Sequence, residues 1–374
     1  MFMLPSARSL TAAVALAALA GCASFEPSPG FVVSPERWRA GVVRRGADPA
    51  EVPNPMALTP EMKTAARELG GIGTDEEKLG HLRAALLDGR GFTFEYERGS
   101  TFSAEEAFAN RRGNCVSFTN LFIALGRSLG IRLQAALVSA RGISTREGDL
   151  IVTYNHMVAV YVAEGGRKEK VYDFYRTGDD LGGQLTLLDD WAVAAIRASN
   201  DGISHLNRGE YEASVHDLEL AVKLDPHLGS LYANLGLARS RTGDVVGAFA
   251  AIRKGLEVEP HGAALLQNLA ALYVSEGKPA EARAALEALD LRWASPYALI
   301  VRGDFEMRGG NVKGAIRLYH DAASADSTLA DPWLAIARAE LARGRPAAAH
   351  KAARKALKRD PGNTEAKQLL DATP

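Results

Sequence analysis

The chain of 374 residues lacks the features that define disulfide-rich or strongly charged proteins. It has only 2 cysteines, and its 44 Lys+Arg against 45 Asp+Glu give a formal net charge of -1. The balanced charge excludes a strongly basic nucleic-acid binder and an acidic disordered tail as leading interpretations. A hydrophobic content of 47% is typical of a soluble globular protein, and the length predicts two or three folding units.

Long hydrophobic runs are also scarce, and the most pronounced one covers only residues 9–21, directly after Arg8. This run is too short to cross a bilayer as a helix, which takes about 20 residues. A basic start, a short apolar stretch and small residues at its end predict a signal peptide over residues 1–21. The end of the run, Leu19-Ala20-Gly21-Cys22, resembles the lipobox of bacterial lipoproteins, and an ordinary signal peptide with a chance cysteine is the alternative.

The lipobox resemblance implies cleavage before Cys22 and diacylation of its thiol, so that the protein is held at a membrane. Ala23 and Ser24 follow, without the Asp that commonly retains such lipoproteins in the inner membrane. By this analogy we expect an outer-membrane lipoprotein that faces the periplasm. Cys115 would then be the one thiol left in an oxidising compartment, either buried and inert or kept for its reactivity.

The composition changes along the chain. Residues 22–60 carry seven of the 16 prolines, which predicts an extended, semi-rigid tether. Residues 61–190 show a mixed pattern, with helices expected over 61–69, 75–88, from the capping box Ser103-x-x-Glu106 through Phe108, and from Cys115 to Leu129 before Gly130. Strands are expected over 131–139, about 151–163 and 168–175, the last two joined by a Gly165-Gly166 turn.

The chain from 195 to 374 has a regular repeat. Glycines recur at intervals of 34, 34, 33 and 34 residues, at positions 209, 243, 277, 310 and 344. Small residues follow each glycine at fixed helical offsets, which lets two antiparallel helices approach closely. The period resembles that of the tetratricopeptide repeat, and it predicts about five units with a closing helix over 364–371. A generic alanine-rich bundle, the alternative, would not keep this register.

Cys115 is the best candidate for a nucleophile because it opens a helix, where backbone N–H groups and the helix dipole favour a thiolate. His156 lies in a predicted strand and Asp173 in the next one. A turn at Gly165-Gly166 pairs Asp173 with Val158, which places His156 and Asp173 on one face as diagonal neighbours. The carboxylate could then orient the imidazole, as in a catalytic triad.

At these residues the chain resembles the transglutaminase-like superfamily of papain-like thiol enzymes. The segment from Arg112 to Thr119, Arg-Gly-Asn-Cys-Val-Ser-Phe-Thr, resembles the nucleophile segment of that family, and the order Cys, His, Asp with gaps of 41 and 17 residues agrees. The resemblance covers about residues 60–180. Met157 follows His156 where the family often has an aromatic residue, which leaves the substrate preference open.

These patterns predict an α+β transglutaminase-like domain over 61–190, followed by an all-α tetratricopeptide solenoid. The resemblance implies an acyl-transfer enzyme that hydrolyses a peptide or amide bond through Cys115, His156 and Asp173. We expect the Cys115 backbone N–H to stabilise the oxyanion, with Asn114 and Asn155 as weak side-chain candidates. No cofactor or metal is expected, and the repeats are expected to bind a protein or peptide. The alternative is a non-catalytic envelope scaffold or assembly protein.

Overall fold

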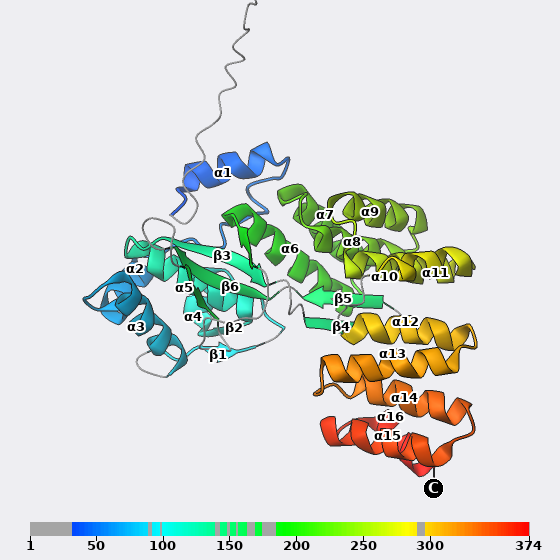
Figure 1. The fold of residues 1–374 in the computed structure, drawn as a ribbon. Coiled ribbons are helices and arrows are strands. Elements are labelled where there is room, and N and C mark those ends of the chain that lie inside the picture. The colour runs from blue at the N-terminus through cyan, green and yellow to red at the C-terminus, as the bar shows by residue number, and fades with distance from the viewer. Residues whose placement is uncertain are drawn as a thin grey trace, which may run out of the picture.

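The structure is a computed structural model that describes residues 32–88, 92–97, 99–138, 143–147, 150–154, 156–162, 169–173, 185–289 and 296–373. Figure 1 shows an N-terminal region of helices around a small sheet, followed by a stack of helix pairs. This arrangement confirms the predicted fold class, an α+β domain followed by an all-α solenoid. Within the described ranges, no helix is both long and apolar enough to span a membrane.

The α+β domain contains the helices that the sequence predicts, and polar side chains cap each of them. Their first turns are capped by Thr59, Thr74, Ser103 and Asn114. At Ser103 both halves of the predicted capping box with Glu106 are formed. The four helices are α2 (Pro60–Gly70), α3 (Asp75–Leu87), α4 (Ala104–Asn110) and α5 (Cys115–Ser128).

A four-stranded antiparallel sheet packs against helix α5. Its strand order is β7-β6-β3-β8, with the bounds β3 (Leu133–Val138), β6 (Met157–Val162), β7 (Glu169–Tyr172) and β8 (Leu185–Leu188). The Thr119 hydroxyl of α5 donates a hydrogen bond to the Met157 carbonyl over 3.2 Å. The helix that begins at Cys115 is therefore bonded directly to the strand that follows His156. A short parallel pair, β1 (Glu95–Tyr96) and β2 (Arg112–Gly113), leads into α5.

The repeat region is a series of antiparallel helix pairs. Its pairs are α6 (Asp190–Asn207) with α7 (Tyr211–Leu224), α8 (Gly229–Arg241) with α9 (Val245–Val258), α10 (Ala263–Ser275) with α11 (Pro279–Glu287), α12 (Pro296–Arg308) with α13 (Val312–Ala325), and α14 (Asp331–Ala342) with α15 (Pro346–Arg359). The five periodic glycines join the helices of each pair and have φ between 68° and 83°, a region that glycine adopts without strain. Helix α16 (Thr364–Asp371) closes the array as expected.

The first helices of successive pairs contact one another and form one side of the array, which we name the first-helix face (α6, α8, α10, α12 and α14). A two-stranded hairpin of the α+β domain lies against this face, as Figure 1 shows. The hairpin consists of β4 (Ile143–Glu147) and β5 (Leu150–Tyr154). Strand β5 contacts α8 and α10, and strand β4 contacts α12.

This hairpin shows that the single strand expected over 151–163 is wrong. Residues 150–154 pair with β4, whereas residues 157–162 belong to the four-stranded sheet. The apolar run continues across both strands, so the sequence pattern does not reveal the break between them. His156 lies at this break, immediately before β6.

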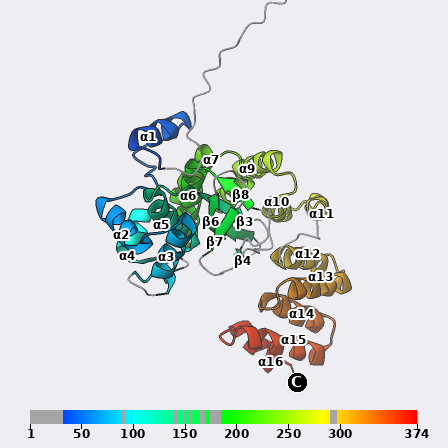
Figure 2. The ribbon, with the colours of Figure 1, turned by 60° about the vertical axis from the view of Figure 1, so that its left-hand side comes forward.

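The extended tether expected from the prolines is also wrong for residues 32–60. Residues 35–44 form helix α1 (Pro35–Arg44), which Ser34 caps by accepting a hydrogen bond from the Arg37 backbone N–H. Pro35 occupies the first helical turn, where its fixed φ and missing N–H favour a helix start. The same residue that suggests an extended chain therefore begins a helix. Helix α1 lies near the start of α6 and the end of α7 (Figure 2).

Helix α1 is attached to the folded protein through Trp38. The Trp38 ring is buried and stacks on Trp191 of α6, with ring centroids 5.6 Å apart and planes inclined by 3°. Its indole N–H donates to the Val52 carbonyl over 2.8 Å. Residues 22–31, including Cys22, lie outside the described residues.

Helix α6 belongs to both parts of the protein. Near its start Val193 and Ile196 are buried in the core of the α+β domain, whereas Ile203 and Leu206 pack into the core of the repeats. The boundary that the sequence places between 190 and 195 therefore falls inside one continuous helix.

Candidate active site

Cys115 is the first residue of α5, as predicted, and its side chain is half-buried against the domain core. Asn114 caps the helix, and its Oδ1 accepts a hydrogen bond from the Ser117 backbone N–H over 3.1 Å. The backbone N–H of the first helical residue has no intrahelical acceptor. The sulfur and an N–H without an intrahelical acceptor therefore lie together at the positive end of the helix dipole.

Gly113 allows the chain to enter this helix. Its φ of 148° is one that side-chain-bearing residues rarely adopt, and a Cβ at this position would overlap the Ser117 side chain. Ser117 is fully buried. The Gly-Asn pair before Cys115 thus has a physical basis, a tight entry followed by a cap.

His156 and Asp173 meet at adjacent ends of two paired strands. His156 Nε2 lies 3.0 Å from Asp173 Oδ2, and both side chains are buried. Tyr172 pairs with Ala159 across β6 and β7, which is the register that the sequence predicts. The Gly165-Gly166 turn itself lies outside the described residues. The predicted diagonal neighbours are therefore in direct contact.

Cys115, the third predicted site residue, interacts with His156. Burial lowers the pKa of His156, but hydrogen bonds to Asp173 and Cys115 and the charges of both outweigh burial and raise the pKa to about 9. The contact with Asp173 is made by Nε2 of the imidazole. A pKa of about 9 favours the protonated imidazole at neutral pH.

A thiol, an imidazole and a carboxylate that interact with one another are the groups that nucleophilic acyl transfer requires. Asn114, one of the weak candidates for an oxyanion donor, caps the helix through Oδ1, and its Nδ2 donates to the Thr101 hydroxyl over 2.7 Å. The other one, Asn155, lies outside the described residues.

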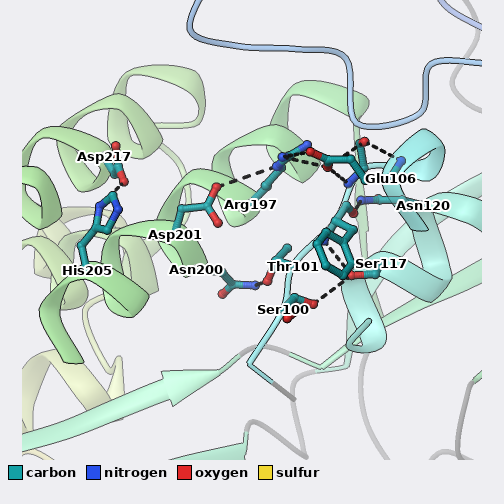
Figure 3. Close-up of polar contacts among 12 residues, drawn as sticks. Ser100, Thr101, Glu106, Ser117, Asn120, Arg197, Asn200, Asp201, His205 and Asp217 are labelled. Atoms are coloured by element: carbon teal, nitrogen blue, oxygen red, sulfur yellow. Dashed lines mark hydrogen bonds and ion pairs between the residues drawn. The ribbon is translucent and has the colours of Figure 1, made fainter. Parts of the chain in front are cut away.

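The sequence did not indicate the polar contacts behind the nucleophile. Ser117 Oγ accepts a hydrogen bond from the Phe102 backbone N–H over 2.8 Å and donates to the Ser100 carbonyl over 3.1 Å. Figure 3 shows these contacts beside Thr101 and Asn200 of helix α6. The residues are polar and scattered, and the Asn114-x-x-Ser117 spacing of a cap is the only local signal for them.

A cavity of about 180 Å³ lies in the repeats, among α8, α10, α11 and α12, and not beside the thiol. The residues that line this cavity are mainly apolar, so the cavity contributes no side chain to a reaction at Cys115. Among the residues that the structure describes, no group of three or more His, Cys, Asp and Glu side chains could hold a metal ion. The Gly178-Asp179-Asp180 segment is outside that set.

Comparison with protein families agrees with this geometry. The transglutaminase-like superfamily model matches residues 63–167, a range that contains Cys115 and His156. Two tetratricopeptide repeat models match residues 268–330 and 330–370. The chain carries a transglutaminase-like domain followed by tetratricopeptide repeats. The helix pairs from α6 onward extend the repeat array towards the N-terminus beyond the matched residues.

The proteins that resemble this chain in sequence or structure match only part of it. It is 28% identical over 109 residues to small glutamine-rich tetratricopeptide repeat-containing protein 2 of Mycosarcoma maydis, covering 29% of this chain and 30% of that protein. It is 37% identical over 67 residues to the heat-shock protein cognate co-chaperone sgt12 of Aspergillus fumigatus, covering 18% and 20%. The tetratricopeptide protein TTC0263 of Thermus thermophilus has a TM-score of 0.41 and 19% identity, covering 48% of this chain and 97% of that one.

Proposed function

We propose that this protein is a cysteine-dependent acyl-transfer enzyme that hydrolyses a peptide or amide bond through Cys115, His156 and Asp173. One observation carries the proposal. The imidazole of His156 lies 3.0 Å from the carboxylate of Asp173, and interaction with Cys115 contributes to the raised pKa of His156. Burial of the His156–Asp173 pair keeps water from competing with these interactions.

The proposed reaction proceeds in two steps. Cys115 Sγ attacks the carbonyl carbon, the C–N bond breaks, and the amine leaves with the proton that the His156 imidazolium donates. Water then attacks the thioester, His156 takes its proton, and the acid leaves as the thiolate returns. The Cys115 backbone N–H donates to the carbonyl oxygen while it carries negative charge. Asp173 stabilises the imidazolium and holds the ring in place.

The proposal extends to the place and partner of the enzyme. Diacylation of Cys22 would anchor it in the outer membrane, where the repeats would bind a protein that is either the substrate or its carrier. Replacing Cys22 by Ser should release the protein from the membrane fraction, and recovery of the variant in that fraction would contradict the anchor. The transglutaminase-like fold, the repeats and the lipobox-like sequence support these assignments.

Alkylation with iodoacetamide tests the catalytic proposal. Site-resolved mass spectrometry should find Cys115 modified quickly at pH 7, and about tenfold or more slowly in His156→Gln, because the imidazolium no longer stabilises the thiolate. His205→Gln is a matched control, since His205 Nδ1 also lies 3.0 Å from an aspartate, Asp217, but on the repeats.

The outcome separates this proposal from the scaffold alternative. A Cys115 that reacts no faster than an ordinary exposed thiol, in the wild type as in His156→Gln, contradicts the enzyme. In that case the anchored scaffold or assembly protein, whose repeats alone do the work, becomes the better explanation. A Cys115→Ala variant with an unchanged cellular phenotype would point the same way.

A further inference from the structure

Helix α6, the first helix of the repeat array, reaches the segment that leads into the nucleophile. Asn200 Nδ2 donates a hydrogen bond to Thr101 Oγ1 over 3.1 Å, across 99 positions of sequence. One turn earlier on the same helix, Arg197 forms an ion pair of 3.0 Å with Glu106. Figure 3 shows both contacts on the side of α6 that faces the α+β domain.

Thr101 receives a second hydrogen bond from the cap of the nucleophile helix. Asn114 Nδ2 donates to the same Thr101 oxygen over 2.7 Å. Both acceptor positions of this hydroxyl oxygen are then used, one by the repeat helix and one by the cap. Asn200, Thr101 and Asn114 thus form a continuous chain of side-chain contacts that ends one residue before Cys115.

The orientation of the Asn114 amide matters at the end of this chain. Its oxygen accepts from the Ser117 backbone N–H, and its nitrogen donates to Thr101. A rotated amide would place its NH₂ group against the Ser117 N–H, so that two donors face each other and the cap is lost. The Thr101 oxygen, held by Asn200, therefore favours the orientation that caps the helix.

The segment around Thr101 has further bonds to the same turn. The Asn114 backbone N–H donates to the Ser100 carbonyl over 3.1 Å, and Asn120 Nδ2 donates to the Phe102 carbonyl over 3.1 Å. A shift of this segment would therefore move the first turn of α5 and, with it, the N–H groups that stabilise a thiolate.

From these contacts we infer that Asn200 is a positioning residue for Cys115, so that the active site is complete only with the first repeat helix. This inference rests on the proposed function. Asn200 contacts neither substrate nor sulfur and acts through Thr101 and Asn114. The catalytic unit therefore extends beyond residues 63–167, which match the transglutaminase-like superfamily, and includes a helix of the repeats. The repeat pattern alone would assign that helix to partner binding.

The full-length chain tests this inference through the ratio of the Cys115 alkylation rates at pH 6 and pH 9. We expect Asn200→Ala to lower this ratio about threefold, because one hydrogen bond that supports the cap is lost. Thr101→Val should lower it at least as much, and Thr101→Ser, which keeps the hydroxyl, should restore it. In the Thr101→Val background, Asn200→Ala should have no further effect, since its acceptor is already absent.

Asn234→Ala is the matched control. Asn234 Nδ2 donates to the Ser199 hydroxyl over 3.0 Å between α8 and α6, so this variant loses a comparable bond within the repeats. It should lower stability and leave the ratio unchanged. If the wild-type thiol is reactive at pH 6, two outcomes would overturn the positioning role of Asn200. One is an unchanged ratio in Asn200→Ala, and the other is an equal fall of the ratio in Asn234→Ala. A wild-type thiol that is unreactive at pH 6 overturns the proposed function itself.

Discussion

Arg127 and Asp190 form a buried, two-pronged ion pair between the nucleophile helix and the first repeat helix. Nη1 and Nη2 of Arg127 lie 2.7 Å and 2.9 Å from the two carboxylate oxygens of Asp190. Their side chains are only 2% and 7% exposed. Arg127 also donates to the Leu133 carbonyl at the start of β3. Helix α5, the sheet and helix α6 are thus joined at one point on the far end of α5 from Cys115.

Asp190→Asn should destabilise the protein by about 3 kcal/mol, because it leaves the Arg127 cation buried without its counter-charge. Urea unfolding followed by tryptophan fluorescence measures the change. Glu365→Gln is the control, since it removes an ion pair of 2.9 Å with Arg338 whose side chains are 46% and 42% exposed. That change should cost less than about 1 kcal/mol. Equal losses in the two variants would contradict the structural role of Asp190.

Trp38→Ala should lower stability by about 3 kcal/mol or more, because it removes a buried ring that stacks on Trp191. It should also expose α1 to trypsin at Arg39 and Arg44. Val43→Ala changes an exposed position of the same helix and should shift stability by less than about 0.5 kcal/mol. A tryptic pattern identical to that of the wild type would mean that α1 docks by other contacts.

Asp173→Asn should slow the alkylation of Cys115 at pH 7, because the imidazole loses the carboxylate that raises the pKa of His156. The amide keeps the size of the side chain, so the expected loss is smaller than the loss of about tenfold or more that we expect in His156→Gln. Asp217→Asn removes the carboxylate beside His205 and should have no effect on the rate. An unaffected rate in Asp173→Asn would exclude Asp173 from the site.

The stability of the protein should fall as the pH rises through 9. Because the pKa of folded His156 is about 9, above the ordinary value of 6.5, its protonated form stabilises the fold fully below pH 6.5. This contribution, at most roughly 3 kcal/mol, is lost as the ring deprotonates. The free energy of unfolding of the wild type minus that of His156→Gln should therefore be larger at pH 6 than at pH 10. A difference that is constant with pH would contradict the raised pKa.

The sequence predicted the candidate site because its determinants are local. A capped helix start fixes the place of Cys115, and the register of strands β6 and β7 brings Asp173 to His156. The repeats were predictable for the same reason, since each glycine acts within its own pair of helices. At the helix start, in the strand register and in the repeats, the local sequence pattern is therefore enough to predict the structure.

Other features could not be predicted because they depend on tertiary contacts. The bond from Asn200 to Thr101 joins polar residues 99 positions apart, and no periodicity marks either one. The break before His156 falls inside one apolar run, where only pairing with β4 separates the two strands. Helix α1 was missed because Pro35 is favourable both in an extended chain and in a first helical turn.

The hairpin β4–β5 covers part of the first-helix face. A protein that docks on α8, α10 and α12 meets strands of the same chain and must bind around them or replace them. Because the strands are covalently tethered, they compete for this face at an effective concentration on the order of millimolar. A partner protein of modest affinity would therefore not displace them. Strand β5 ends two residues before His156, so the strand that covers the repeats and the candidate active site are adjacent in the chain.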